Sequence, residues 1–393
     1  MKNNPNKFVP KQASEITLAW LATCLQRLHP QSTEKLVAFH TRSAPRQGMT
    51  SSVHILELVF AQDVGAQPCE LSNPRYLLAK FSTTHPLAQE ALAANRGFQR
   101  EFDFYQNFSD QSCLAIPSCY WAHYDPVTNQ AGLLLEYIED TRVTSVHDGS
   151  IEDIQAVLEQ LAPFHARWWD QSEKLSVLFQ GQDHFIVDPI LAKLELALTN
   201  IRLYHRAEVG ETLIALLEEW IENPHHLIAC EQQKPQTLCH GDLHRDQILF
   251  PSQAGGLIRL IDWQMASRDS GAYDLAYLLM TGLRPEQRLI CEHLMVENYH
   301  AQLLANGVTD YPLEALWDSY RFSIARIAIY FLSALSAPDV APILAWWDSD
   351  IKRKGVSFWK ATYQGISEAI EQHRVLDYLA QLKDTARHPR TKP

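Results

Sequence analysis

Residues 238–265, LCHGDLHRDQILFPSQAGGLIRLIDWQM, contain the side chains of this chain that are best suited to chemistry. Asp242 lies early in the block, an amide side chain, Gln247, follows five residues later, and Asp262 ends an apolar run. Phosphoryl transfer needs a general base and oxygen ligands for a hard divalent cation, and it uses this spacing of an aspartate and an amide before a second aspartate. The block therefore predicts a phosphoryl-transfer site.

Each of these three residues has a chemical role open to it and a structural alternative. Asp242 follows Gly241, which permits a tight turn where a substrate must approach, so its carboxylate could take the proton of an acceptor hydroxyl. Asp262 is expected at the tip of the strand LIRLI, where a carboxylate can bind Mg²⁺. Either aspartate alone could equally be a cap or turn residue. Gln247 could bind the metal, or it could only support the loop while Asp246 supplies the oxygen.

A bound nucleotide also needs a cation near its phosphates, and Lys80 is the candidate. It lies inside the apolar run LLAKF, where an unpaired buried ammonium is costly, so we expect a carboxylate partner and an anionic ligand. Glu101, on a helix predicted within 87–108, is the expected partner. The alternative is an edge-strand lysine that faces water. Residues 46–52 form a loop whose single glycine is a weak signal, and the phosphate contacts expected there are Gly48, Thr50 and Ser51.

Two other kinds of site are weaker alternatives. His240 and His244 are four residues apart, as zinc ligands on a helix can be, but Gly241 between them favours a loop. Tryptophans and aspartates of the second half could form an aromatic, acidic pocket for a cationic substrate, although aromatic residues at helical spacing more often belong to the core. These residues are Trp168, Trp169, Trp317, Trp346, Trp347, Asp318, Asp348 and Asp350.

The elements that must position these residues change type along the chain. Residues 14–28 predict an opening helix with Ser14 as its N-cap. Residues 36–82 contain three β-rich runs, and AGLLLEYIED (131–140) predicts a buried strand. After about residue 150 the patterns are helical, except for the short apolar strands expected within 246–263.

Composition limits the class of protein. With 393 residues the chain is long enough for two lobes, and 34 basic against 46 acidic residues give a net charge of −12. That charge argues against a nucleic-acid surface. The seven cysteines form no Cys-x-x-Cys pair, the polar start of the chain does not resemble a signal peptide, and no apolar run reaches the length of a membrane span. We therefore expect a cytoplasmic protein with no membrane partner.

Together these motifs resemble the aminoglycoside phosphotransferase and choline kinase-like family of small-molecule kinases, in its ecdysteroid-kinase-like branch. The similar segments occur in family order over roughly residues 36–280. HGDLH followed by IDWQ and DLAYLL is specific, whereas the glycine loop is not. The segments are RYLLAKF, EFDFY, LLLEYIED, LEQLAPFHARWW, HGDLH, IDWQ and GAYDLAYLL.

The resemblance implies a role for each matching residue. Asp242 would be the catalytic base, Gln247 and Asp262 the metal ligands, and Lys80, held by Glu101, the phosphate contact. His165 and Asp274 would be structural, and backbone around three hinge residues would contact adenine: Glu136, Tyr137 and Ile138. The chain departs from the family where Gln247 replaces Asn, after Arg245-Asp246 where Pro-Gly is common.

The resemblance also implies a fold and an activity. The fold would be α+β, a bilobal protein-kinase-like fold with a small β-rich N-lobe (1–137) and a larger, mainly helical C-lobe (138–393). The activity would be ATP- and Mg²⁺-dependent phosphorylation of a hydroxyl on a small molecule. An amino-alcohol, a sugar-like antibiotic and a steroid-like alcohol remain open as acceptor, and so does GTP as donor. The alternative from another class is a catalytically impaired pseudokinase that binds nucleotide or acts as a scaffold.

Overall fold

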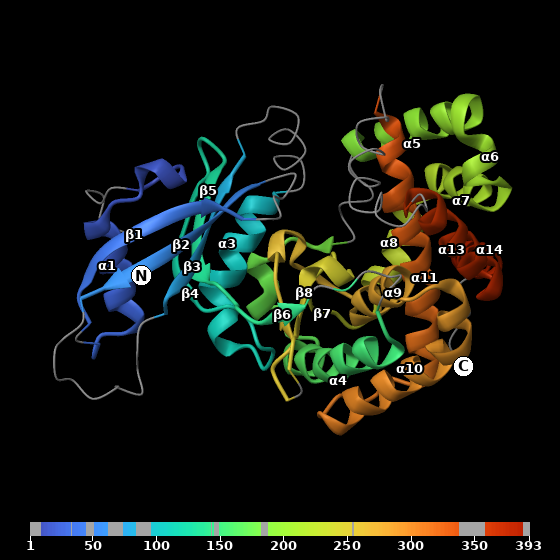
Figure 1. Cartoon of the computed structure of the whole chain (residues 1–393). Coiled ribbons are helices and arrows are strands. Elements are labelled where there is room, and N and C mark those ends of the chain that lie inside the picture. Colours follow the sequence, from blue (N-terminus) through green and yellow to red (C-terminus); the bar gives the residue numbers. More distant parts are fainter. Residues whose placement is uncertain are drawn as a thin grey trace. The chain divides into compact units, whose positions relative to one another are not determined.

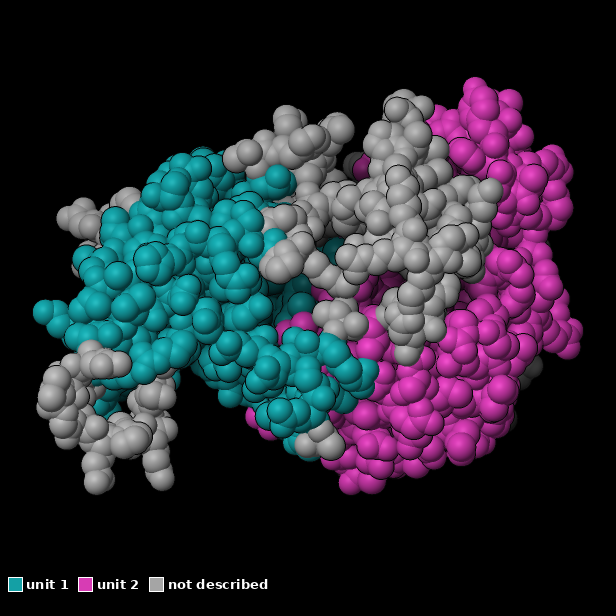
Figure 2. Space-filling view, in the orientation of Figure 1, with its two compact units in different colours: residues 1–142, 251–265 teal, residues 143–250, 266–393 magenta. Residues whose placement is uncertain are grey.

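The computed structural model describes residues 9–32, 34–44, 51–61, 74–83, 96–142, 144, 149–181, 188–253, 255–337 and 358–387. The chain divides into two compact units, coloured teal and magenta in Figure 2. Unit 1 comprises residues 1–142 and 251–265, and unit 2 comprises residues 143–250 and 266–393. The segment 251–265, which carries Asp262, thus belongs to the unit that contains Lys80.

Unit 1 is built on a five-stranded antiparallel sheet of order β1-β2-β3-β5-β4 (Figure 1). Val, Ile, Leu and aromatic residues in these runs favour strands, and alternation along β2 buries Leu56 and Leu58 in one cluster. In β3, Lys80 pairs with Val53 of β2 and Leu133 of β5, so the lysine is in a central strand. The strands are β1 (Leu36–Ser43), β2 (Ser51–Phe60), β3 (Tyr76–Ser82), β4 (Cys119–Asp125) and β5 (Gln130–Glu136).

Helix α1 (Leu18–Leu28) packs its apolar side against this sheet. Leu21, Cys24 and Leu25 are buried in one cluster with residues of β2, β3 and β4. The helix begins at an N-cap threonine, Thr17, whose side chain accepts a hydrogen bond from Trp20 N at 3.3 Å. The predicted N-cap Ser14 was therefore wrong, since it lies in a short 3₁₀ turn, η1 (Ala13–Glu15), before the helix.

Helix α3 (Gly97–Asn107) carries Glu101 and holds the segment that follows Asp262. The ring of Phe104 stacks on Trp263 with centroids 3.7 Å apart, and Arg100 donates to the carbonyl of Met265 at 3.4 Å. Only part of the predicted helix 87–108 is therefore observed, because residues 84–95 lie outside the described residues. The remaining elements of unit 1 are η2 (Ser109–Gln111), β6 (Thr141–Arg142), β9 (Arg259–Leu260) and η7 (Trp263–Met265).

Unit 2 is mainly helical, and α9 (Gly271–Gly282) lies in its core. Nearly every residue of α9 is buried, and its N-cap Ser270 accepts a hydrogen bond from Ala272 N. Helix α4 (Ile151–Trp168) is capped by Ser150 and packs with α10. The other helices are η3 (Lys174–Val177), α5 (Asp188–Asn200), the π-helical η5 (Ile201–His205), α6 (Arg206–Val209), α7 (Glu211–Glu222), α8 (Pro224–Gln232), α10 (Pro285–Ala305), α11 (Leu313–Ser333), η8 (Ala334–Ser336), α13 (Phe358–Gln372) and α14 (Val375–Arg387).

A short antiparallel pair in unit 2 leads into the region of Asp242. Strand β7 (Thr237–Cys239) pairs with β10 (Ser267–Asp269), with Leu238 opposite Arg268. Beyond β7 come the loop with Asp242, the 3₁₀ turn η6 (Arg245–Gln247) and β8 (Ile248–Pro251).

The predicted fold class is confirmed: a β-rich unit and a larger, mainly helical unit carry the α+β architecture, in the chain order expected of a kinase-like fold. No helix within the described ranges is long and apolar enough to cross a membrane.

Candidate active site

The predicted site residues fall into two groups, one in each unit, and unit 1 holds a lysine between two carboxylates. Lys80 Nζ lies 2.8 Å from Glu101 Oε2 and 2.7 Å from Asp262 Oδ1. The side chains of Lys80 and Glu101 are 11% and 4% exposed, whereas that of Asp262 is 33% exposed. The predicted pairing of Lys80 with Glu101 is present, and Asp262, 182 residues further along, meets the same ammonium group.

The electrostatics of this group keep the lysine charged. Burial alone would lower the pKa of Lys80, but the two carboxylates outweigh burial and hold that pKa above its ordinary value. Burial raises the pKa of Glu101 to about 6, against the lowering effect of Lys80. A protonated amine beside a partly exposed carboxylate offers both a cation for phosphate oxygens and an oxygen ligand for a metal.

Asp262 owes its position to an unusual backbone conformation. Its φ is +62°, a left-handed value that few residues other than glycine, asparagine and aspartate adopt. The stacked Trp263 ring fixes the residue that follows. Strand β9 ends at Leu260, so Asp262 lies beyond the strand, directly before η7, rather than at the tip of the strand as the apolar run predicted.

Of the residues predicted to bind adenine and phosphate, those in the predicted hinge and Ser51 lie within the described residues. Glu136 ends β5, and its carboxylate accepts hydrogen bonds from the backbone and the hydroxyl of Ser118, both at 3.1 Å. The ring of Tyr137 packs edge-on against Tyr76, and Ile138 follows in the connecting segment. Ser51 is buried at the start of β2, whereas Gly48 and Thr50 lie outside the described residues.

In unit 2, Asp242 lies in a loop that α9 anchors. Asp274 of α9 accepts the backbone N–H groups of His240 at 2.6 Å and Gly241 at 2.8 Å. Gly241 has φ +83°, which a glycine adopts without strain. Tyr277, also on α9, donates its hydroxyl to Asp242 Oδ1 at 2.5 Å. The motif reading did not include Tyr277, although its spacing of three residues from Asp274 placed both on one face of the helix.

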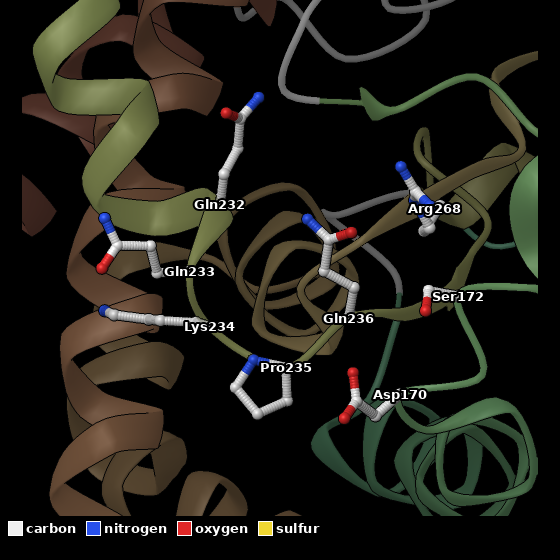
Figure 3. A pocket seen from close by; sticks show the side chains of 8 residues that line it. All are labelled: Asp170, Ser172, Gln232, Gln233, Lys234, Pro235, Gln236 and Arg268. Atoms are coloured by element: carbon white, nitrogen blue, oxygen red, sulfur yellow. The ribbon is translucent and has the colours of Figure 1, made fainter.

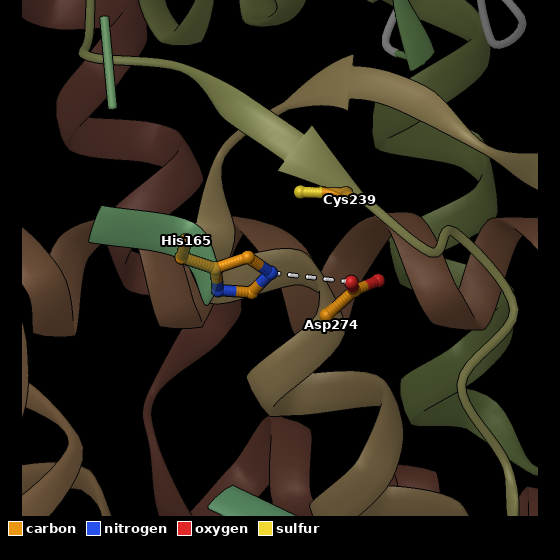
Figure 4. A group of neighbouring side chains, drawn as sticks. All are labelled: His165, Cys239 and Asp274. Atoms are coloured by element: carbon orange, nitrogen blue, oxygen red, sulfur yellow. Dashed lines mark hydrogen bonds and ion pairs between the residues drawn. The ribbon is translucent and has the colours of Figure 1, made fainter. Parts of the chain in front are cut away.

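His165, Cys239 and Asp274 form a fully buried cluster beneath this loop (Figure 4). His165 Nε2 lies 3.4 Å from Asp274 Oδ2, and its Nδ1 lies 2.6 Å from the hydroxyl of Tyr299. Burial alone would raise the pKa of Asp274, but His165 and the loop N–H groups hold it below its ordinary value.

The three residues have metal-ligand types, yet their environment favours a structural network. Both Asp274 oxygens already accept backbone N–H groups. Burial raises the pKa of the Cys239 thiol, which disfavours the thiolate that a metal needs. Zinc binding by His240 and His244 was the predicted alternative. Among the described residues, the only group of three or more metal-ligating side chains is the one that contains His165, and neither of these two histidines belongs to it.

The loop after Asp242 differs from the common pattern, and its unusual residues have partners. The guanidinium of Arg245 donates to the carbonyl of Gly282 at 2.6 Å, the hydroxyl of Thr144 at 2.9 Å and the carbonyl of Ser150 at 3.0 Å. The loop is therefore tied to the end of α9 and the start of α4. These partners are 37 to 101 residues away in sequence, so the motif could not indicate them.

Gln247 lies against His244. Its amide nitrogen is 3.3 Å from His244 Nε2, and the same ring nitrogen is 3.6 Å from Asp242 Oδ2. Asp246, the alternative oxygen donor, is exposed, and its backbone N–H donates to His244 Nδ1 at 3.3 Å. Gln247 is thus close to Asp242, in unit 2, while Asp262 lies in unit 1.

Of the aromatic residues considered for a cationic pocket and described by the structure, only Trp168 belongs to the core, whereas Trp169 and Trp317 are half-buried and pack against other rings. Trp168 is buried, Trp169 packs edge-on against Tyr311, and Trp317 contacts the rings of Tyr320 and His373. Four further members lie outside the described residues: Trp346, Trp347, Asp348 and Asp350.

A polar cavity of about 250 Å³ lies elsewhere in unit 2 (Figure 3). Its basic side chains already have partners, since Lys234 binds Glu231 at 2.9 Å and Arg268 donates to Gln180 at 2.7 Å. None of the predicted site residues lines it. The lining residues are Asp170, Ser172, Gln232, Gln233, Lys234, Pro235, Gln236 and Arg268.

Two solved structures resemble the chain at low sequence identity. The GDP and kanamycin complex of APH(2")-IIIa is 15% identical, with a TM-score of 0.47 over 91% of this chain and 99% of that chain. The choline kinase LicA from Streptococcus pneumoniae is 13% identical, with a TM-score of 0.43 over 92% and 99% of the two chains.

Sequence comparisons give a relative and a family. An "Uncharacterized kinase-like protein D1044.1" of Caenorhabditis elegans is 22% identical over 244 residues. The match covers 56% of this chain and 61% of that protein, so the chain spans less than two thirds of the relative. Residues 79–343 match the model of the family DUF1679, described as "Uncharacterized oxidoreductase dhs-27". Since this match covers more than half of the chain, the protein belongs to the DUF1679 family.

Proposed function

We propose that this protein is an ATP- and Mg²⁺-dependent phosphotransferase that phosphorylates a hydroxyl group of a small molecule. The observation that carries the proposal is the buried contact of Lys80 with both Glu101 and Asp262 in unit 1. One carboxylate is enough to neutralise a buried ammonium group. Here a second, partly exposed carboxylate shares the ammonium group, which suits a site where phosphate oxygens and a metal compete for the same charges.

Each predicted site residue has a separate role in this proposal. Lys80, kept protonated by its neighbours, would bind the α- and β-phosphates, while Glu101 holds the lysine in place. Asp242 would accept the proton of the acceptor hydroxyl as its oxygen attacks the γ-phosphorus. Backbone at Glu136, Tyr137 and Ile138 would contact adenine, and Gly48, Thr50 and Ser51 would contact phosphates. In this proposal the ranges 1–137 and 138–393 keep their expected functional division, with Asp262 as an exception.

The oxygen donors of the site fit magnesium. Mg²⁺ prefers carboxylate and amide oxygens, which Asp262 and Gln247 provide. Asp262 is a third exposed, so its carboxylate can exchange the contact with Lys80 for a cation. The metal would supply positive charge that neutralises the phosphates.

The family description names an oxidoreductase, but the sequence favours phosphoryl transfer. A Rossmann site for a nicotinamide cofactor needs closely spaced glycines, Gly-x-Gly-x-x-Gly, and the 15 glycines of this chain contain no Gly-x-Gly pair. The name of the kinase-like relative agrees with the proposal.

The test is an ATP-consumption screen over amino-alcohols, aminoglycosides, sugars and steroid-like alcohols, run with and without Mg²⁺ and repeated with GTP. We expect one acceptor class to stimulate turnover, and Asp242→Asn to abolish it. A thermal shift with ATP reports nucleotide binding by an enzyme and by a pseudokinase alike, because bound ligand raises the melting temperature in either case, so turnover is the measurement that separates the two. Mg²⁺-dependent binding without turnover for every acceptor would favour the pseudokinase, and full turnover by Asp242→Asn would refute the base assignment.

A further inference from the structure

We propose that Tyr277 is the positioning residue of Asp242: its hydroxyl holds Oδ1 of the carboxylate and leaves Oδ2 as the oxygen that takes the acceptor proton. The inference rests on the proposed function and deepens it. It names a residue outside the matched motif roles and the individual oxygen atom that would act as the base.

Helix α9 holds the Asp242 loop by two separate contacts. Asp274 fixes the backbone of the loop through two N–H groups, and Tyr277, three residues later on the same face, fixes the side chain of Asp242. All three residues belong to unit 2, and Tyr277 is 2% exposed. Because α9 is buried along nearly its whole length, both contacts come from a rigid element.

The contact has the chemistry of a strong hydrogen bond. A distance of 2.5 Å between a phenol oxygen and a carboxylate oxygen is at the short end of charge-assisted hydrogen bonds. Burial and the charge of Asp242 raise the pKa of Tyr277 well above its ordinary value, so the hydroxyl stays protonated and remains a donor. The tyrosine therefore orients the carboxylate and does not compete for the acceptor proton.

The second oxygen has a different environment. Asp242 Oδ2 is 3.6 Å from His244 Nε2, beyond hydrogen-bond distance, and the aspartate side chain is 22% exposed. His244 Nδ1 accepts the N–H of Asp246, and its Nε2 lies 3.3 Å from the amide nitrogen of Gln247, which is a donor. Oδ2 is thus the carboxylate oxygen that an acceptor hydroxyl can reach.

In the proposed reaction, proton transfer to Asp242 accompanies phosphoryl transfer to the acceptor. The acceptor O–H bond breaks and its proton passes to Asp242 Oδ2, while the acceptor oxygen forms a bond to the γ-phosphorus. The bond from that phosphorus to the β–γ bridging oxygen breaks, and ADP leaves with the electron pair. Throughout, Oδ1 keeps its hydrogen bond from Tyr277.

The test compares Tyr277→Phe with a matched control, Tyr320→Phe. Tyr320 is equally buried in unit 2, and its hydroxyl donates to a carboxylate, Glu292 Oε1, at the same 2.5 Å. Both variants lose the same chemical group, so both should lose stability. Misplacement of a catalytic group by about 1 Å can cost on the order of 100-fold in rate, so we expect Tyr277→Phe to lower kcat roughly 10- to 100-fold with acceptor KM unchanged. Tyr320→Phe should keep kcat within about twofold of wild type, because it does not touch Asp242.

A measurement that does not need turnover separates this inference from the proposed function. Melting temperatures of the single and double variants of Tyr277→Phe and Asp242→Ala form a double-mutant cycle. We expect Tyr277→Phe to lower the melting temperature in the wild-type background and to change it little beside Asp242→Ala. Additive shifts would overturn the contact itself, and equal kcat losses in both tyrosine variants would overturn the positioning role. Absence of turnover in wild type with every acceptor, together with non-additive melting shifts, would refute the proposed function and leave the Tyr277–Asp242 contact supported.

Discussion

Replacing Lys80 with methionine should destabilise unit 1 and abolish Mg²⁺-dependent nucleotide binding. Methionine keeps most of the volume of the side chain but removes the charge that pairs with two carboxylates. Removing one partner of a buried ion pair typically costs about 3–5 kcal/mol. Glu101 is almost fully buried, whereas Asp262 is a third exposed and can be hydrated, so we expect about 3 kcal/mol, the lower end of that range.

This loss should depend on pH in a defined direction. The pKa of Glu101 is already raised to about 6 by burial, and removing Lys80 takes away the neighbour that lowers it. The folded variant therefore binds a proton more tightly than the unfolded chain does, and its stability falls as pH rises through the folded pKa. The loss of stability relative to wild type should be largest at pH 8. It should become smaller as pH falls toward about 4.3, the ordinary pKa of glutamate.

The assay is thermal unfolding at pH 5 and pH 8, with and without ATP and Mg²⁺. Unit 1 contains 157 residues, a size at which about 3 kcal/mol corresponds to roughly 6–12 °C in melting temperature. Lys234→Met is the matched control, because Lys234 pairs with the buried Glu231 at 2.9 Å in unit 2. That variant should lose stability and retain the nucleotide-dependent shift.

Two results would refute this reasoning. A Lys80→Met protein that melts within about 2 °C of wild type at pH 8 would show that the ion pair contributes little, as an exposed pair does. A Lys80→Met protein that keeps the full shift with ATP and Mg²⁺ would show that Lys80 is not a phosphate contact.

Three further changes test other parts of the site. Asp274→Asn should destabilise unit 2 by about 2–4 kcal/mol in urea unfolding, because an amide cannot accept both loop N–H groups with charge assistance; a loss below about 0.5 kcal/mol, ordinary for a surface substitution, would contradict the anchor. Gln247→Ala should raise the Mg²⁺ concentration for half-maximal activity about tenfold, whereas Gln247→Asn should preserve it; no change in either variant would exclude Gln247 as a ligand. Asp103→Asn should raise the melting temperature at pH 8 but not at pH 4, since burial raises the pKa of Asp103 to about 6 and its charge costs stability above that pH; equal effects at both pH values would contradict it.

Local patterns predicted those contacts whose partners lie in regular elements. Lys80 in an apolar strand required a carboxylate, and the following helix supplied Glu101, because burial leaves a charged side chain few alternatives. The pattern also indicated Asp262, since an apolar run ending in aspartate has a recognisable boundary. Its left-handed backbone and its contact with Lys80 could not be predicted, because both depend on how Trp263 stacks on α3.

Contacts made by irregular segments were not predictable in the same way. The three acceptors of Arg245 are a helix end, a loop hydroxyl and a residue before a helix, and no periodicity in the sequence links them. The N-cap of α1 was placed three residues too early, because Ser14 and Thr17 both suit a cap and only packing of Leu21 and Leu25 against the sheet selects the second. Tyr277 could have been found from its helical spacing to Asp274 alone.

Gln247, where the family pattern has asparagine, and Tyr277 lie at different places in the proposed site. Asp242 is fixed by Asp274 through the loop backbone and by Tyr277 through its side chain, whereas Gln247 lies against His244. Under the proposed function, a change at Gln247 would act on the metal and on His244, while a change at Tyr277 would act on the proposed base. The two kinds of variant separate a weakened metal site from a misplaced base, and an impaired metal site alone would slow a kinase without making it a scaffold.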